Sequence, residues 1–368
     1  MRGIIAGGGT GGHFYPAFAV AKEFTKGKNE IVFAVKKDDI SLNALIKQDI
    51  PFVEIDMVSF PRTINPLKYV RFLFKLTKSV IFANRIIYDF EPDFIFSTGS
   101  YIAFPFIIPA YLRKIPIYIH ESNRIFGIGN YISGFFAKKI FLGLPVKKNP
   151  FEKKSLLTAT PIREIFSESI SKDDLKKRFN IPSQNRVITF FGGSQGAKRI
   201  NEAAYYFVLD NLTHKINNIT VIHITGKKNY DEMKSLYETA GLKQNLILYD
   251  YYENMNEIYA MSDIVVSRAG SSTISELIQT KTPAILIPLP SSAANHQYEN
   301  AIFLFENRCA VIVKDDEWLI TNIIKNIRFL LESNRLEIMR RSYNSIDIPS
   351  PVNSTQKIVK EIIKDINI

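Results

Sequence analysis

The sequence predicts an α/β protein with two Rossmann-like domains, each built on a parallel β-sheet. Short apolar runs alternate with helical segments through most of the chain, as expected of parallel βαβ units. Two glycine-rich loops, at residues 7–12 and 192–196, each follow an apolar run and precede a helix. With 368 residues and 46% hydrophobic content, the chain can form two domains of ordinary size.

In the first half of the chain, five short apolar runs predict strands that are joined by helices. The expected strands are residues 3–6, 31–35, 94–97, 117–120 and 139–142. A helix is expected over residues 16–26, directly after the first glycine-rich loop. A long helix is expected over residues 66–88, where basic side chains recur at helical spacing.

The second half of the chain repeats this order. Its expected strands are residues 187–191, 220–225, 246–249, 264–267 and 284–288. Its expected helices include residues 203–212, 230–240, 255–261 and 273–279. Because strand–helix–strand units connect parallel strands in the right-handed sense, each half predicts one parallel sheet.

A break around Pro161 separates the two series of strands. We therefore expect an N-terminal domain over residues 1–162 and a C-terminal domain over residues 163–345. Residues 346–368 include an apolar-periodic helix over 354–366, which is expected to pack back on the N-terminal domain.

Cysteine usage and the N-terminal residues narrow the class of protein. The single cysteine, Cys309, excludes a disulfide framework and a cysteine-based metal cluster, and it favours a reducing compartment. The first residues lead at once into glycines and lack the pattern of a signal peptide.

The positive charge is concentrated in the first half of the chain. Residues 1–163 contain 23 Lys and Arg against 12 Asp and Glu, whereas the remainder contains 24 of each. Such an asymmetry predicts an anionic partner for this half. Because no nucleic-acid-binding motif is present, nucleic acid is not expected to be this partner.

Residues 62–88 are the candidate for contact with an anionic membrane surface. Six basic residues and no acidic one lie between Met57 and Tyr88. Lys68, Arg71, Lys75 and Lys78 follow helical spacing, while Val70, Leu73, Phe74, Val80 and Ile81 lie mainly around the other sides of the helix. A basic amphipathic helix can rest on an anionic bilayer, although an ordinary solvated helix has the same pattern.

The two glycine-rich loops predict binding of phosphate groups. Glycine allows the backbone to approach a ligand closely, and the following helix presents free N–H groups and the positive end of its dipole. Two such loops, half a chain apart, predict two domains that face one ligand.

Four motifs in order carry a resemblance to a known family. They are GGGTGGH at residues 7–13, HESN at 120–123, GGSQGA at 192–197 and RAGSSTISE at 268–276. Together they resemble the MurG family, which transfers N-acetylglucosamine from its UDP donor to lipid-linked N-acetylmuramyl-pentapeptide in bacterial wall synthesis. The resemblance implies a GT-B fold with a cleft between an N-terminal acceptor domain and a C-terminal UDP-sugar domain.

The resemblance also implies a cellular location, a cofactor requirement and a type of mechanism. It implies a peripheral enzyme on the cytoplasmic face of the cell membrane, with no cofactor and an inverting mechanism. The sequence contains no Asp-x-Asp motif for a diphosphate-bound metal. Helix N-termini and backbone N–H groups would then stabilise the leaving diphosphate.

The resemblance implies a set of residues that bind the donor. Ser194 and Arg163 would lie at the diphosphate, Glu276 would accept the ribose hydroxyls, and Gln297 would contact the sugar, with Tyr252 near the uracil. The full expected set is Thr10, Gly11, Gly12, Asn123, Arg163, Ser194, Tyr252, Ser271, Ser272, Thr273, Ile274, Ser275, Glu276 and Gln297. Simpler roles for Ser194 and Arg163 are a helix N-cap and a surface charge.

Two residues are candidates for the base that deprotonates the acceptor hydroxyl. His13 ends the first glycine-rich loop, and imidazole exchanges protons readily at neutral pH. Glu121, in the HESN motif, is the alternative base. Other functions with this layout are a UDP-sugar 2-epimerase, another lipid glycosyltransferase, and a non-catalytic nucleotide-binding module.

Overall fold

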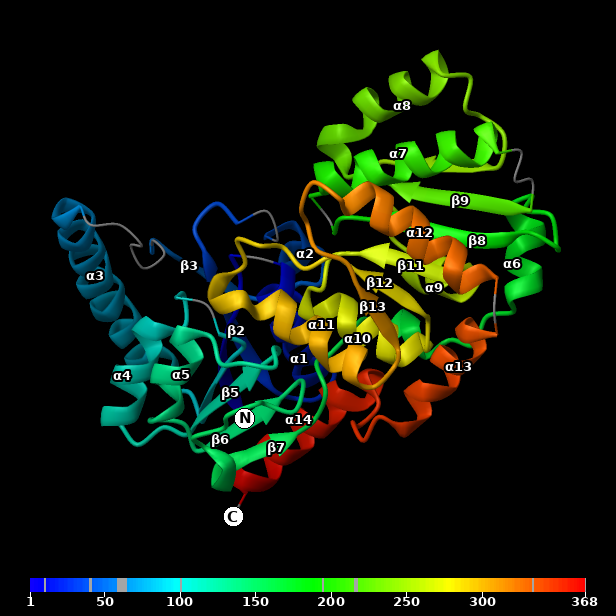
Figure 1. Ribbon diagram of the computed structural model, residues 1–368. Coiled ribbons are helices and arrows are strands. Elements are labelled where there is room, and N and C mark those ends of the chain that lie inside the picture. Colours follow the sequence, from blue (N-terminus) through cyan, green and yellow to red (C-terminus); the bar gives the residue numbers. More distant parts are fainter. Residues whose placement is uncertain are drawn as a thin grey trace. The chain divides into compact units, whose positions relative to one another are not determined.

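The computed structural model describes residues 1–9, 11–39, 42–57, 65–99, 101–193, 195–214, 218–332 and 334–367. The chain divides into two compact units (Figure 1). Unit 1 comprises Met1–Arg163 and Ile348–Ile368, and unit 2 comprises Glu164–Asp347.

Unit 1 contains a parallel sheet with the strand order β3-β2-β1-β4-β5-β6-β7 in its described part. The strands are β1 (Arg2–Ala6), β2 (Glu30–Lys36), β3 (Phe52–Ile55), β4 (Phe94–Ser97), β5 (Ile117–Glu121), β6 (Lys139–Leu142) and β7 (Ser155–Leu157). The order reverses between β1 and β4, so the loops that leave these two strands diverge there. Ligands of open parallel sheets bind at such a switch point.

Helices cover both faces of the sheet in unit 1. They are α1 (Gly11–Thr25), α2 (Leu42–Lys47), α3 (Pro66–Phe90), α4 (Phe104–Leu112), α5 (Ile128–Gly134) and α14 (Pro351–Ile366), with a 3₁₀ turn at Glu152–Lys154. Buried side chains of α1 and α14, including Phe14 and Ile358, share one core with Phe94 and Phe141. Side chains of α3 and α4 form the core on the other face.

Unit 2 contains a second parallel sheet, with the order β10-β9-β8-β11-β12-β13 in its described part. The strands are β8 (Arg186–Phe191), β9 (Ile219–Ile224), β10 (Leu246–Tyr249), β11 (Ile264–Ser267), β12 (Ala284–Leu286) and β13 (Ala310–Ile312). The switch point of this sheet lies between β8 and β11. The second glycine-rich loop leaves β8 at this point.

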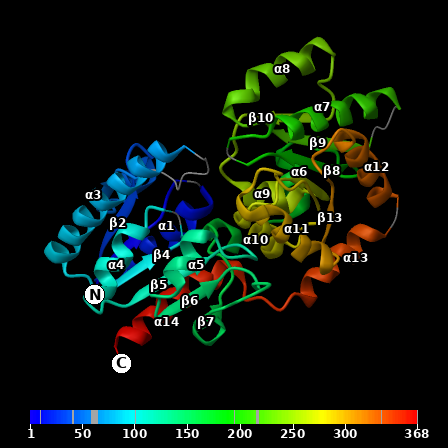
Figure 2. The ribbon, with the colours of Figure 1, turned by 60° about the vertical axis from the view of Figure 1, so that its left-hand side comes forward.

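The helices of unit 2 connect these strands (Figure 2). They are α6 (Lys172–Arg178), α7 (Lys198–Thr213), α8 (Tyr230–Thr239), α9 (Met255–Met261), α10 (Ser271–Thr280), α11 (His296–Glu306), α12 (Leu319–Leu331) and α13 (Arg335–Ser342). Short 3₁₀ turns lie at Glu164–Ser167, Lys227–Asn229, Ala293–Asn295 and Tyr343–Ser345.

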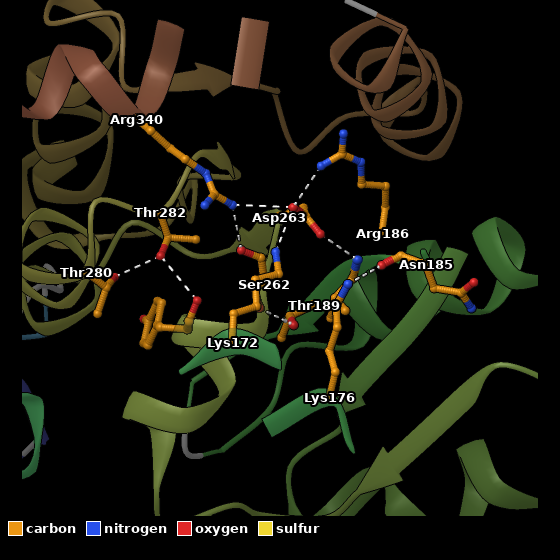
Figure 3. Close-up of polar contacts among 12 residues, drawn as sticks. Lys172, Lys176, Asn185, Arg186, Thr189, Ser262, Asp263, Thr280, Thr282 and Arg340 are labelled. Carbon is orange, nitrogen blue, oxygen red and sulfur yellow. Dashed lines mark hydrogen bonds and ion pairs between the residues drawn. The ribbon is translucent and has the colours of Figure 1, made fainter. Parts of the chain in front are cut away.

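A buried carboxylate joins several elements at the amino end of β11 (Figure 3). Asp263 accepts bonds from Lys172 Nζ at 2.7 Å and from the Val187 amide at 2.9 Å, and it pairs with Arg186 and Arg340. Burial alone would raise the pKa of Asp263, but Lys172 and the other donors hold it below its ordinary value. The cluster therefore fixes the end of the sheet opposite to the glycine-rich loop.

The predicted fold class is confirmed, with two parallel-sheet Rossmann-like units. The sequence did not predict three short strands, which are β3, β7 and β13. Helices α1 and α7 also begin five residues earlier than expected. Within the described ranges, no helix combines the length and the apolar character that a membrane crossing needs.

Candidate functional site

The first glycine-rich loop connects β1 to α1 at the switch point of unit 1. A Cβ atom on Gly7 would lie 2.4 Å from that of Ala17, so only glycine allows α1 to pack this closely on the strand end. The Gly9 amide donates a hydrogen bond of 2.8 Å to the Asp39 carboxylate. Gly11 and Gly12 begin α1, whereas Thr10 lies outside the described residues.

His13 is the third residue of α1 and is half-buried. Its Nδ1 atom lies 2.8 Å from the carbonyl oxygen of Thr98, which follows β4. Because a carbonyl oxygen can only accept a hydrogen bond, Nδ1 carries the proton in this contact. The lone pair of the neutral ring is then on Nε2.

Glu121 ends β5 and is 1% exposed. Its Oε1 accepts from the Asn123 amide at 3.0 Å and from Asn123 Nδ2 at 2.9 Å. Its Oε2 accepts from the Gly127 amide at 3.0 Å and from Asn130 Nδ2 at 2.8 Å. The carboxylate thus holds together the loop that leads from β5 to α5, and it fixes the side chain of Asn123.

The neighbouring His120 is fully buried, and its ring nitrogens contact the Ala159 carbonyl at 3.1 Å and Ser122 Oγ at 3.1 Å. Burial lowers the pKa of His120 to about 4. This histidine is therefore neutral at physiological pH and supports the loop structurally. Arg163 is half-buried and is the last residue of the first segment of unit 1.

The second glycine-rich loop connects β8 to α7. Gly196 has φ of +75°, and a Cβ atom there would lie 2.1 Å from the Thr225 carbonyl oxygen. Glycine is therefore required for both the turn and its packing against the loop after β9. Ser194 lies outside the described residues.

The loop after β11 opens helix α10. Gly270 is its N-cap residue, and the first turn contains Ser271, Ser272 and Thr273 without any acidic side chain. The amide groups and the dipole of this helix end favour an anion. Ser271, Ile274 and Ser275 are buried, so these side chains seat the helix in the domain.

Glu276 lies in the second turn of α10 and is half-buried. Its Oε2 accepts a hydrogen bond of 2.9 Å from the hydroxyl of Tyr259, a buried residue of α9. Gln297, near the start of α11, accepts a bond of 3.0 Å from the Leu289 amide through its side-chain oxygen. The loop after β12 and the helix α11 are thereby joined.

Tyr252 borders a pocket of about 470 Å³ at the edge strand β10. Its hydroxyl donates to Glu257 at 2.6 Å, and Glu257 also pairs with Arg178. Burial, followed by the bond to Glu257, raises the pKa of Tyr252 well above its ordinary value. The phenol is therefore a neutral donor at physiological pH.

Two carboxylates that support the loops were not identified from the sequence. Asp39 holds Gly9, as described above, and it follows the end of β2. Asp315 follows β13 and pairs with Arg268 at 2.8 Å and with Arg199 at 3.3 Å. Since Arg268 precedes the α10 turn and Arg199 follows the second glycine-rich loop, Asp315 joins the two loops of unit 2. In the described ranges, no three His, Cys, Asp or Glu side chains are grouped as metal ligands.

These features define a class of protein. Two Rossmann-like units, with glycine-rich loops and helix N-termini at their switch points, have the GT-B fold. Residues 4–142 match the glycosyltransferase family 28 N-terminal domain, and residues 187–362 match the family 28 C-terminal domain. Two solved structures illustrate the shared fold. Acinetobacter baumannii MurG superposes with a TM-score of 0.78 at 24% identity, over 99% of each chain. Neisseria meningitidis UDP-GlcNAc 2-epimerase superposes with a TM-score of 0.66 at 15% identity, over 99% of this chain and 100% of that one.

Whole-length relatives identify the family more narrowly. The chain is 35% identical to the UDP-N-acetylglucosamine--N-acetylmuramyl-(pentapeptide) pyrophosphoryl-undecaprenol N-acetylglucosamine transferase of Elusimicrobium minutum, over 98% of both chains. It is 31% identical to the Halothermothrix orenii protein of the same name, over 99% of this chain and 100% of that one. The chain therefore belongs to this family of N-acetylglucosamine transferases.

Proposed function

We propose that this protein transfers N-acetylglucosamine from UDP-N-acetylglucosamine to a lipid-linked N-acetylmuramyl-pentapeptide, forming the disaccharide precursor of bacterial peptidoglycan. The observation that carries this conclusion is the whole-length match to transferases named for this reaction. The Neisseria meningitidis UDP-GlcNAc 2-epimerase has the same fold, but its sequence is only 15% identical. An epimerase function is therefore supported by the fold and not by the sequence.

Unit 2 binds the UDP-sugar donor. The first amides of α10, from Ser271 to Thr273, bind the diphosphate, with Ile274 and Ser275 in the turn that follows. Ser194 adds a hydroxyl, and Arg163 of unit 1 adds a full charge. Glu276 accepts the ribose hydroxyls, Gln297 contacts the sugar, and Tyr252 lies at the uracil. Support comes from the helix N-terminus without acidic residues and from the loops that Asp315 joins.

Unit 1 binds the acceptor and supplies the base. Nε2 of His13 takes the proton of the acceptor hydroxyl, since Nδ1 is engaged with Thr98. Asn123, with Gly11 and Gly12, contributes contacts to the UDP-sugar from the same end of the sheet. Glu121 has four donors around its carboxylate and therefore positions Asn123 instead of moving a proton.

The reaction is a single displacement at the anomeric carbon. The acceptor oxygen forms a bond to this carbon as the bond to the diphosphate oxygen breaks, which inverts the anomeric configuration. His13 receives the proton, and UDP leaves with the additional negative charge. Backbone amides and the α10 dipole stabilise that charge without a metal ion.

Unit 1 also docks on an anionic membrane surface at the cytoplasmic face of the membrane. Its 26 basic and 14 acidic residues give a formal charge of +12, against −1 for unit 2. The surface is the α3–α5 patch, formed by three helices of which α4 packs against both α3 and α5 (Figures 1 and 2). Its exposed apolar members are Leu67, Val70, Leu73, Phe74, Ile81, Phe82, Tyr88, Ile108, Tyr111, Leu112, Ile128, Tyr131, Ile132 and Phe135.

Basic side chains lie among these apolar ones. Lys68, Arg71 and Lys78 are exposed on α3, and Lys78 Nζ lies 4.4 Å from the Phe74 ring centre. Val70, Leu73 and Phe74 are exposed as well, so the outer side of α3 is both basic and apolar, unlike the separate sides expected from the sequence. Lys75 pairs with Asp56 at 2.5 Å, and Arg62 lies outside the described residues.

The test of the function is a transfer assay. Purified enzyme is given UDP-N-acetylglucosamine with and without lipid-linked N-acetylmuramyl-pentapeptide, and both UDP and the glycosylated lipid are measured. We expect UDP release only with acceptor, together with an equal amount of disaccharide-lipid. Release of UDP and N-acetylmannosamine without acceptor would indicate the epimerase instead.

A further inference from the structure

The hydrogen bond between Tyr259 and Glu276 links two helices of unit 2 by their side chains. Tyr259 belongs to α9 and is 1% exposed, and its hydroxyl lies 2.9 Å from Glu276 Oε2. Glu276 projects from α10, the helix whose amino end follows the β11 loop. The hydroxyl donates into the carboxylate, which is the charge-assisted form of this bond.

Aromatic neighbours hold the Tyr259 ring in place. The ring of Phe191, at the end of β8, lies edge-on with centres 5.9 Å apart and an interplanar angle of 84°. The ring of Phe166 lies at 5.8 Å and 59°. A phenol in such a buried environment needs one acceptor for its hydroxyl, and Glu276 provides it. Tyr259 is thus a rigid support for a more flexible side chain.

We propose that Tyr259 is a positioning residue for recognition of the nucleotide ribose. Its hydroxyl holds the Glu276 carboxylate in the orientation that accepts the ribose hydroxyls, and this inference rests on the proposed function of Glu276. A glutamate side chain has several rotatable bonds, and ordering them before the ligand arrives reduces the entropy lost on binding.

This role has a specific consequence for ligand preference. A support for the carboxylate strengthens binding only when the ribose hydroxyls are present. Tyr259→Phe keeps the ring and its packing and removes only the hydroxyl. It should therefore weaken UDP by about fivefold, equal to about 1 kcal/mol, and weaken 2′-deoxy-UDP, which keeps only the 3′-hydroxyl, by less.

The experiment measures dissociation constants of UDP and 2′-deoxy-UDP by calorimetry for the full chain and four variants. These are Tyr259→Phe, Glu276→Gln, the double variant, and the control Tyr343→Phe. Tyr343 is also buried in unit 2, and its hydroxyl donates to the Thr282 carbonyl at 2.8 Å, so the control removes a comparable bond elsewhere.

Wild type should prefer UDP, Glu276→Gln should lose this preference, and Tyr259→Phe should lose part of it. The double variant should be no weaker than Glu276→Gln, because both residues act on one contact. If Tyr259→Phe keeps the wild-type preference, or weakens both ligands equally as a packing defect would, the inference is wrong. If Glu276→Gln itself keeps the preference, the proposed ribose contact is wrong and the inference is overturned with it.

Discussion

The backbone and side chains of His13 and Thr98 are joined by two hydrogen bonds. His13 Nδ1 donates to the Thr98 carbonyl at 2.8 Å, and Thr98 Oγ1 donates to the His13 carbonyl at 2.6 Å. His13 lies in the first turn of α1, which follows β1, and Thr98 lies in the loop after β4, so the two residues are on either side of the switch point of unit 1. The bonds orient the imidazole ring and select the tautomer with its lone pair on Nε2.

The first prediction concerns His13 as the base. His13→Asn should lower kcat by about 10²- to 10⁴-fold, the usual effect of losing a general base. The dissociation constant of UDP should stay within about twofold, since the proposed donor contacts of unit 2 are untouched. Steady-state kinetics with calorimetry would test this, with His214→Asn on the exposed end of α7 as the control. A tenfold or smaller fall in kcat would exclude His13 as the base.

The second prediction separates a positioning role of Glu121 from a base. Glutamine at this position keeps one accepting oxygen, but its NH2 group cannot accept, so either the two bonds from Asn123 or the two from Gly127 and Asn130 are lost. Glu121→Gln should therefore reduce the free energy of unfolding of unit 1 by about 1–3 kcal/mol. Urea unfolding followed by circular dichroism would measure it, with the exposed Glu152→Gln as control. Unchanged stability with a large loss of kcat would instead support a base.

Several elements could be predicted because their sequence signal is local. The strands at 94–97, 139–142 and 264–267 match the structure to the residue, since central strands of parallel sheets read as continuous apolar runs. The edge strand at 246–249 also matches, because its four residues are an uninterrupted apolar and aromatic run. Edge strands β7 and β13 have only three residues each, too few for such a pattern. Helix α1 begins at Gly11 because packing of Phe14 and Ala17 outweighs the low helix propensity of its first residues.

The same distinction applies to the candidate site. Glycine-rich loops are contiguous in sequence and can be recognised without a structure. The residues that hydrogen-bond or pair with the site residues cannot be recognised in this way, because they are far away in the sequence and only the fold brings them together. Thr98 lies 85 residues from His13, and Asp39 lies 30 residues from Gly9. Arg199 and Asp315 are separated by 116 residues, and the strand that precedes Asp315 was not predicted.

The third prediction is the pH dependence of unit 2. Burial lowers the pKa of His223 to about 3, whereas an unfolded histidine titrates near its ordinary value of 6.5. As pH falls below 6.5, only the unfolded state takes up this proton, so stability is full above 6.5 and is lost toward pH 3. The expected loss is about 1.4 kcal/mol per pH unit, or about 2 kcal/mol between pH 6.5 and 5.

Urea unfolding at several pH values would measure this slope through tryptophan fluorescence. The only tryptophan, Trp318, lies in unit 2, so its signal follows that unit. His223→Gln should reduce this slope by about 1.4 kcal/mol per pH unit, which corresponds to one proton, whatever the substitution does to stability at pH 7. An equal slope in wild type and His223→Gln would contradict the assignment.

The last prediction concerns the α3–α5 patch. Each cation near an anionic surface contributes about 1 kcal/mol, and salt screens this attraction over about 10 Å. Reversing Lys68, Arg71 and Lys78 to glutamate should therefore abolish sedimentation with vesicles of phosphatidylglycerol and phosphatidylcholine. Lys75 is left unchanged, because a glutamate there would face Asp56 and destabilise the unit.

The apolar members of the α3–α5 patch provide an independent test. Leu73→Ser with Phe74→Ser should weaken vesicle binding at all salt concentrations, whereas binding of wild type should fall as salt rises. The control reverses Lys228, Lys234 and Lys243, exposed lysines of unit 2 with the same total charge change. UDP affinity should remain at its wild-type value in every variant. If the control loses as much binding as the α3 reversal, net charge alone governs adsorption and the patch is not the docking surface.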